Sequence, residues 1–174
     1  MEKLLIVVDM QNDFIDGALG TKEAQAIVEN VIHKIEGFDG SIIATLDTHR
    51  DDYLDTREGR FLPVAHCIKN TAGWEINPKV KSVLKQKGFR MIEKPTFGSV
   101  ELPKLIKEKY NTKNLRIELV GLCTDICVVS NAMLLKAEFP EMDISVDSSC
   151  CAGVTPEKHE AALETMRSCQ IEVR

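Results

Sequence analysis

The chain has 174 residues, enough for one well-filled domain and few for two. Hydrophobic residues make up 44% of it and charged residues 28%, with a formal net charge of −5, as is common in globular proteins. It has no basic cluster, which argues against nucleic acid as a partner. We therefore expect a single domain over residues 1–174.

The N-terminal apolar run is too short for an export signal or a membrane span. Only Leu4 to Val8 stand between Met1-Glu2-Lys3 and Asp9. The six cysteines are then expected to be reduced thiols, and the Cys150-Cys151 pair agrees, because neighbouring cysteines rarely bond to each other. We expect a cytoplasmic protein that has no membrane partner and forms a homo-oligomer.

Apolar strand patterns alternate with helical patterns along the chain. Leu4 to Val8 is a continuous aliphatic run, which is typical of a strand buried on both faces. Thr21 caps a predicted helix that runs to about Glu36, and Thr155 with Pro156 begins the last helix. The other predicted strands are Ser41–Leu46, Phe89–Glu93, Arg116–Leu122, Asp143–Val146 and Ile171–Val173, and the other helices are Pro78–Lys87, Ser99–Tyr110 and Asp125–Glu138.

This alternation predicts an α/β fold with three layers, αβα, around a mostly parallel six-stranded sheet. Ligands bind beyond the carboxyl ends of the strands in such sheets. Residues 50–74 lack periodicity but contain Phe61 and Trp74, so we expect a functional loop there rather than disorder. The polar residues that follow strand ends are Asp9, Asp47 with His49, Lys94, and Cys123 with Cys127.

Cys127 is the candidate nucleophile. It lies in the first turn of the helix predicted after Thr124 and Asp125, where the helix dipole and the nearby Lys94 favour thiolate. Asp9 can carry the thiol proton to a leaving amine, which completes a nucleophilic set. The alternative is structural: Cys127 as a small buried hydrophobe, Asp9 as a turn cap and Lys94 as a surface lysine.

Oxygen and imidazole donors gather around the second predicted strand end and the loop that follows it. Two donors, Asp47 and His49, are spaced i,i+2, and Glu58 and His66 come from the loop. This set suits a divalent metal with open coordination positions. A cysteine zinc site is the alternative, although Cys-x-x-Cys spacing is absent; its ligands would come from Cys67, Cys123, Cys127, Cys150 and Cys151.

Four stretches together resemble the isochorismatase-like cysteine hydrolases and, within them, the nicotinamidases. They are Val8–Phe14, then Asp47–His49 with Glu58 and Pro63–Cys67, then Glu93–Phe97, and finally Gly121–Val128. They occur in the family's order over nearly the whole chain. The resemblance implies Asp9, Lys94 and Cys127 as catalytic residues. It also implies a cis peptide at Leu122–Cys123 and an oxyanion hole formed by the N–H groups of Cys123 and Cys127.

The activity implied by the resemblance is conversion of nicotinamide to nicotinate and ammonia through a cysteine thioester. A divalent metal, zinc first, with iron or manganese as alternatives, would bind the pyridine nitrogen and place the ring. Its ligands would be Asp47, His49, Glu58 and His66, and the ring would be walled by Phe14, Leu62 and Phe97. The histidine that usually follows soon after His49 is absent, and Glu58 stands where some members use a glutamate.

Other functions remain open at this point. A sister amidohydrolase would act on another small amide or carbamoyl compound. An isochorismatase proper is disfavoured, because those enzymes cleave a vinyl ether without a thiol and lack this donor set. A binding or assembly protein on the same sheet is a further alternative of a different class.

Overall fold

The computed structural model describes residues 1–174 and contains one six-stranded sheet in which every pair of neighbours is parallel. The strand order is β3-β2-β1-β4-β5-β6. The strands are β1 (Glu2–Val8), β2 (Ser41–Asp47), β3 (Arg90–Lys94), β4 (Leu115–Leu122), β5 (Asp143–Ala152) and β6 (Glu172–Val173). The predicted α/β fold with a parallel six-stranded sheet is confirmed.

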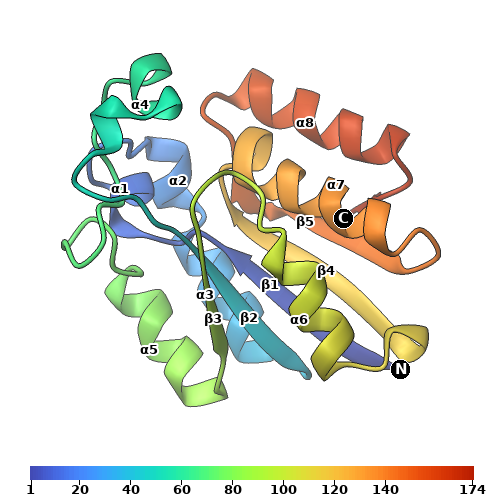
Figure 1. Cartoon of the computed structure of the whole chain (residues 1–174). Coiled ribbons are helices and arrows are strands. Elements are labelled where there is room, and N and C mark those ends of the chain that lie inside the picture. The colour runs from blue at the N-terminus through green and yellow to red at the C-terminus, as the bar shows by residue number, and fades with distance from the viewer.

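Helices cover both faces of the sheet, with α2, α3 and α5 on one side and α6, α7 and α8 on the other (Figure 1). The helices are α1 (Asn12–Ile15), α2 (Lys22–Ala26), α3 (Val28–Gly37), α4 (Arg57–Phe61), α5 (Pro78–Lys87), α6 (Glu101–Lys109), α7 (Val129–Glu138) and α8 (Pro156–Ser168). Short turns add η1 (Tyr53–Asp55), η2 (Thr112–Asn114) and the π-helical η3 (Thr124–Val128).

The aliphatic run of β1 supplies both hydrophobic cores. Leu5 and Val7 pack into the core under α3 and α5, whereas Leu4, Ile6 and Val8 pack into the core under α6, α7 and α8. Each fully buried aliphatic side chain of this kind contributes about 1.5–3 kcal/mol. Burial on both faces explains why this strand has no polar alternation.

The sheet reverses its strand order between β1 and β4. The chain moves outward from β1 to β2 and β3 and then returns to β4 on the other side of β1. Ligands of doubly wound sheets bind at this point, beyond the carboxyl ends. Gly121 near the end of β4 has a φ of +120°, and a side chain there would collide with the carbonyl of Val8. The two strand ends therefore lie in close contact.

Several predicted boundaries were wrong. The helix predicted from Thr21 to about Glu36 is two helices separated at Ile27, although Thr21 does cap the first by accepting a hydrogen bond from the Ala24 N–H at 3.0 Å. The segment 50–74 contains η1 and α4, which are too short to give a periodic signal. Gly88 ends α5 as predicted, with a φ of +75°.

The two elements after β4 also differ from the prediction. The helix expected at Asp125 begins as η3, and its N-cap is Cys123, which makes no side-chain capping bond. β5 continues to Ala152 after a register shift against β4, so residues 147–150 lie within the strand rather than after it. A bulge of this kind cannot be read from a hydrophobic pattern.

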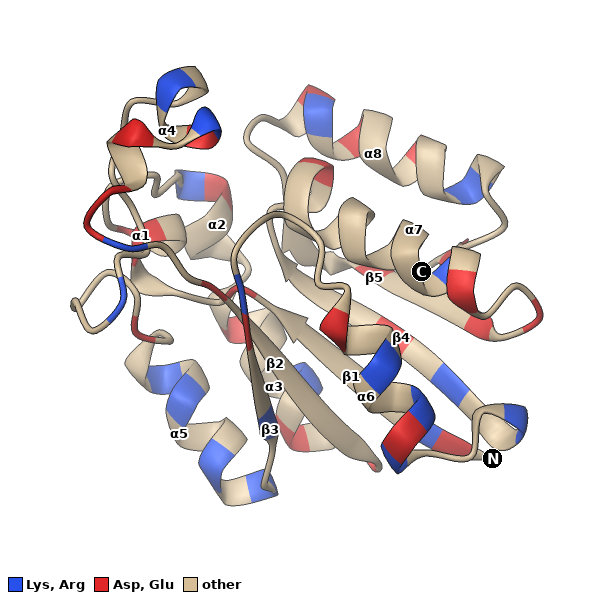
Figure 2. Cartoon of the chain, in the orientation of Figure 1, with Lys and Arg blue, Asp and Glu red and all other residues tan.

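Charged residues are distributed differently on different helices. Figure 2 shows acidic and basic residues mixed along α6 and α8, whereas α5 carries only basic ones. Two of the α5 lysines are paired, Lys79 with Glu29 of α3 and Lys81 with Glu75 of the preceding loop. Much of the positive charge of α5 is thus matched locally. No helix in the structure combines the length and the apolar character needed to span a membrane.

Candidate functional site

The ammonium group of Lys94 brings the predicted nucleophilic set together at the carboxyl edge. Its Nζ lies 2.6 Å from Asp9 Oδ2 and 3.4 Å from Cys127 Sγ. It also lies 3.4 Å from Asp47 Oδ1 and donates a hydrogen bond to the carbonyl of Thr96 at 3.0 Å. Lys94 and Asp9 are fully buried. Three residues from the ends of three strands therefore share one buried site, as the sequence predicted.

One carboxylate oxygen of Asp9 accepts a hydrogen bond, and the other does not. Thr45 Oγ1 donates to Asp9 Oδ1 at 2.7 Å. Oδ2 has no hydrogen-bond partner apart from the ion pair with Lys94. The backbone of Asp9 has a φ of +47°, a conformation that is uncommon outside glycine and turns the chain sharply at the end of β1. Oδ2 is thus placed to accept a proton.

Burial dominates the ionisation of the thiol. It raises the pKa of Cys127 well above its usual range, and the charge of Asp9 adds to this effect, while Lys94 opposes it. Burial also raises the pKa of Asp9. Desolvation of a side chain only 4% exposed therefore opposes the thiolate that the sequence led us to expect, and it outweighs the favourable charge of Lys94. Burial thus favours the thiol form of Cys127.

Lys94 keeps its charge in this environment. Burial alone would lower the pKa of Lys94, but Asp9, Cys127 and Asp47 together raise it above its usual range. The site therefore contains a permanent positive charge between two acidic groups and a thiol. A thiolate formed during a reaction would lie beside that charge.

The four predicted metal ligands form the one cluster of metal-binding side chains in the structure. Their ligand atoms all lie within 4.8 Å of one another, and three of the residues are buried. Separations involving His49 Nε2 are 3.0 Å to Asp47 Oδ2 and 3.6 Å to Glu58 Oε1. Those of His66 Nε2 to the same two oxygens are 3.5 and 3.8 Å.

These four separations, 3.0–3.8 Å, are centred on the spacing of a tetrahedral divalent site. Ligand bonds of about 2.0–2.2 Å place neighbouring donor atoms about 3.3–3.6 Å apart. His66 Nδ1 lies 2.8 Å from the carbonyl of Val64, an arrangement that directs Nε2 toward the cluster. Although burial opposes it, hydrogen bonds from His49 and His66 hold the pKa of Asp47 well below its usual range. The cysteines expected in the alternative zinc site do not gather in this way.

The proposed ring-wall residues differ in their placement. Phe14 is buried, and its ring centroid lies 5.6 Å from that of His66. Leu62 and Phe97 are 39% and 43% exposed. The backbone carbonyl of each accepts a hydrogen bond, that of Leu62 from the Tyr53 hydroxyl at 2.9 Å and that of Phe97 from Asn131 Nδ2 at 3.2 Å. Of these three residues only Phe14 is in aromatic contact with the donor cluster, which Tyr53 also contacts, with ring centroids 4.7 Å from His49 and 4.9 Å from His66.

Buried polar residues that the sequence did not single out support the site. Gln11 Nε2 donates to the Asp47 carbonyl at 2.8 Å, and Gln11 Oε1 accepts from the Asp47 N–H at 2.8 Å. Asn131 Nδ2 donates to the Cys127 carbonyl at 2.8 Å. Asn131 is a polar residue four positions after Cys127 on a buried helix face, a signal that could have found it.

The backbone beside the nucleophile matches one further expectation. The Leu122–Cys123 peptide is cis, as the resemblance implied. The carbonyl of Cys123 accepts hydrogen bonds from the N–H groups of Ile126 and Val128 at 3.1 and 3.0 Å. The turn that carries Cys127 thus closes back onto the end of β4.

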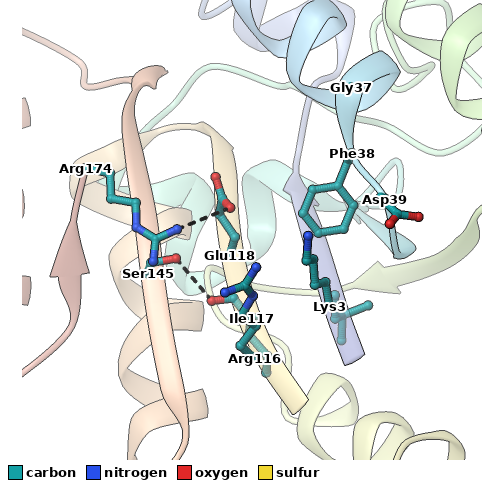
Figure 3. A pocket seen from close by; sticks show the side chains of 10 residues that line it. Lys3, Gly37, Phe38, Asp39, Arg116, Ile117, Glu118, Ser145 and Arg174 are labelled. Atoms are coloured by element: carbon teal, nitrogen blue, oxygen red, sulfur yellow. Dashed lines mark hydrogen bonds and ion pairs between the residues drawn. The ribbon is translucent and has the colours of Figure 1, made fainter. Parts of the chain in front are cut away.

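A separate hollow of about 150 Å³ lies at the opposite, amino edge of the sheet. Figure 3 shows Lys3, Arg116, Glu118 and Arg174 around it. Arg174 lies 4.0 Å from Glu118, and the hollow contains no cysteine or histidine. This hollow therefore shares no residue with the nucleophilic set or the donor cluster.

Comparison with known proteins gives consistent results. Two solved structures are similar over nearly their whole length. Pyrococcus horikoshii pyrazinamidase in complex with zinc is 28% identical with a TM-score of 0.80, covering 100% of this chain and 99% of that one. Bacillus subtilis nicotinamidase/pyrazinamidase is 27% identical with a TM-score of 0.84, covering 99% of each chain. Schizosaccharomyces pombe nicotinamidase is 24% identical, covering 97% of this chain and 91% of its own. The isochorismatase domain matches residues 3–174, and the chain therefore belongs to the isochorismatase family.

Proposed function

We propose that this protein is a nicotinamidase, an amidohydrolase that converts nicotinamide to nicotinate and ammonia. The observation that carries the proposal is the position of Lys94, within 2.6 Å of Asp9 and 3.4 Å of Cys127, beside a four-donor cluster. A nucleophile, a base and a metal-binding set are thus adjacent. Relatives named nicotinamidase or pyrazinamidase support the same activity.

The reaction would begin with proton transfer from the Cys127 thiol to Asp9, whose pKa is raised by burial. The sulfur attacks the carboxamide carbon, and Asp9 returns the proton to the leaving nitrogen, so ammonia departs and a thioester remains. Asp9 next takes a proton from water, and the resulting hydroxide attacks the thioester. The sulfur leaves as the thiol with that proton, which releases nicotinic acid and restores the enzyme.

Lys94 would stabilise the charges that form in these steps. It faces both the thiolate of Cys127 and the carboxylate of Asp9, and its own charge does not change. The N–H groups of Cys123 and Cys127 would receive the oxyanion of each tetrahedral intermediate. Preorganised donors of this kind are among the largest contributions to catalysis.

Asp47, His49, Glu58 and His66 would hold a divalent metal, for which we propose zinc. When bound, this ion would act as a Lewis acid on the pyridine nitrogen and fix the ring. Phe14 would form one wall of the ring site, with Leu62 and Phe97 at its mouth. We also propose that the protein assembles as a homo-oligomer.

Ammonia release from nicotinamide tests the proposal. The purified protein should release ammonia, lose the activity with a chelator and regain it with zinc. Cys127→Ala should lower kcat by about a thousandfold or more, because no thioester can form, while Cys169→Ala at an exposed position should behave as wild type. Near-normal turnover in Cys127→Ala would overturn the mechanism. Turnover of another small amide or carbamoyl compound, but not of nicotinamide, would favour the sister amidohydrolase.

A further inference from the structure

The turn that carries the nucleophile, η3, contacts α8, a helix that supplies no residue of the nucleophilic set or the donor cluster. This helix, α8, packs against η3 on the outer side of the sheet (Figure 1). Its His159 Nδ1 lies 2.8 Å from Thr124 Oγ1. Thr124 is fully buried and precedes Cys127 by three residues. The contact therefore joins α8 to the start of the nucleophile turn.

A second hydrogen bond joins the same two parts of the chain. The N–H of Val154, in the loop before α8, donates to Asp125 Oδ1 at 2.9 Å. The side chains of Thr124 and Asp125 thus bind the first turn of α8 and the loop that precedes it. Neither side chain has a hydrogen bond or ion pair with Lys94, so the contacts of the Thr-Asp pair are with the α8 side of the turn.

Two residues that precede His159, Gly153 and Thr155, fix its position. A Cβ added to Gly153 would lie 2.8–2.9 Å from the backbone N, Cα and Cβ of His159, so a glycine lets the helix approach this closely. Thr155 caps α8 by accepting from the Lys158 N–H at 3.3 Å, and the His159 N–H donates to the Thr155 carbonyl at 3.0 Å. His159 therefore projects from a fixed first turn.

The nucleophile turn needs support from outside itself. It begins without a side-chain cap, and π-helical turns are rare. Asn131 holds the Cys127 carbonyl from the α7 side at 2.8 Å. His159 holds the opposite end of the turn. Cys127 lies between these two hydrogen-bonded residues, with its Sγ 3.4 Å from Lys94 Nζ.

We propose that His159 is a positioning residue for the amidase reaction, acting through Thr124 on the geometry of Cys127. This inference rests on the proposed function. Misplacement of a reacting group by about 1 Å can cost about a hundredfold in rate, so partial loosening of the turn should be visible in kcat. Substrate binding should be unaffected, because His159 lies outside the donor cluster.

The test compares His159→Ala with His159→Asn and Glu160→Ala. Asparagine keeps a polar atom near the position of Nδ1, and Glu160 is an exposed neighbour on α8 with no ion pair or hydrogen bond from its side chain. We expect His159→Ala to lower kcat about tenfold with KM unchanged, His159→Asn to recover most of it, and Glu160→Ala to match wild type. Unchanged kcat in His159→Ala would overturn the inference, as would a loss that asparagine does not restore.

A second measurement separates this inference from the proposed function. The rate at which iodoacetamide modifies Cys127, relative to the exposed Cys169, needs no substrate. His159→Ala should increase that rate severalfold, because a loosened turn exposes the buried thiol more often. An unchanged rate would overturn the inference even if nicotinamide is the substrate. An increased rate in a protein inactive on nicotinamide would support it and refute only the proposed function.

Discussion

Replacing Lys94 with methionine tests whether the buried charges at the site depend on one ammonium group. Methionine has a similar length but no charge, so the cavity stays filled while two carboxylates lose their counterion. Lys94 has no exposed side-chain surface, and its partners Asp9 and Asp47 lie 2.6 and 3.4 Å away. The variant therefore creates uncompensated buried negative charge.

The expected loss follows from this burial. Removing one partner of a buried ion pair costs about 3–5 kcal/mol of unfolding free energy. For a domain of this size each kcal/mol corresponds to about 2–4 °C in Tm, so Tm should fall by about 6–20 °C. Without Lys94 the pKa of Asp9 in the folded state rises further. The difference in unfolding free energy between the variant and the wild type should then become smaller as the pH falls and Asp9 takes up a proton.

Urea and thermal unfolding at pH 7 in the presence of a chelator measure this difference without any contribution from bound metal. Lys69→Met is the matched control, since its pair with Glu93 is 47% and 35% exposed and should be worth less than about 1 kcal/mol. If Lys94→Met were no more destabilising than Lys69→Met, the three buried groups could not be charged as described. The same result would remove the role of Lys94 in stabilising the thiolate.

Three further outcomes are expected. His49→Ala should lose the divalent metal in elemental analysis while its circular dichroism stays unchanged; a full complement of metal would exclude this residue as a ligand. Peptide mapping after brief iodoacetamide treatment should find the exposed Cys169 modified before Cys127; the reverse order would contradict the raised pKa of the Cys127 thiol. Although burial opposes it, the carboxylates of Glu118 and Asp147, 2.6 and 2.7 Å from Nζ, raise the pKa of Lys34 to about 12. The contribution of Lys34 to the unfolding free energy is therefore complete below pH 10.5 and is lost between pH 10.5 and 12. Lys34→Met should show a shallower loss of unfolding free energy over that interval, and an identical slope would contradict the assignment.

The position of the site was predictable because parallel strands put their carboxyl ends at one edge. Asp9 and Cys127 follow strands with buried apolar residues, which are visible in the sequence, whereas Lys94 ends the edge strand β3, in which it is the only buried residue. The sheet then brings them within hydrogen-bond or ion-pair distance without any further information. The long segment after β2 could be recognised as functional, but the short α4 that carries Glu58 could not, because five residues give no helical period.

Properties that depend on the surroundings of a side chain were not predictable in the same way. The protonation of Cys127 is decided by desolvation, which requires knowing what covers it. The break at Ile27 and the π-helical start of η3 depend on packing between distant elements. The contact of His159 with Thr124 joins residues 35 positions apart, and no local pattern marks it.

The two oxygens of Asp47 face in different directions. Oδ2 lies 3.0 Å from His49 Nε2 and 3.5 Å from His66 Nε2, while Oδ1 lies 3.4 Å from Lys94 Nζ. For protein engineering, this makes Asp47 an unsuitable position for changing metal or substrate preference, because loss of its carboxylate also removes a partner of Lys94, the residue beside Cys127. Libraries aimed at new amides should leave Asp47 fixed and vary the donors that do not contact Lys94.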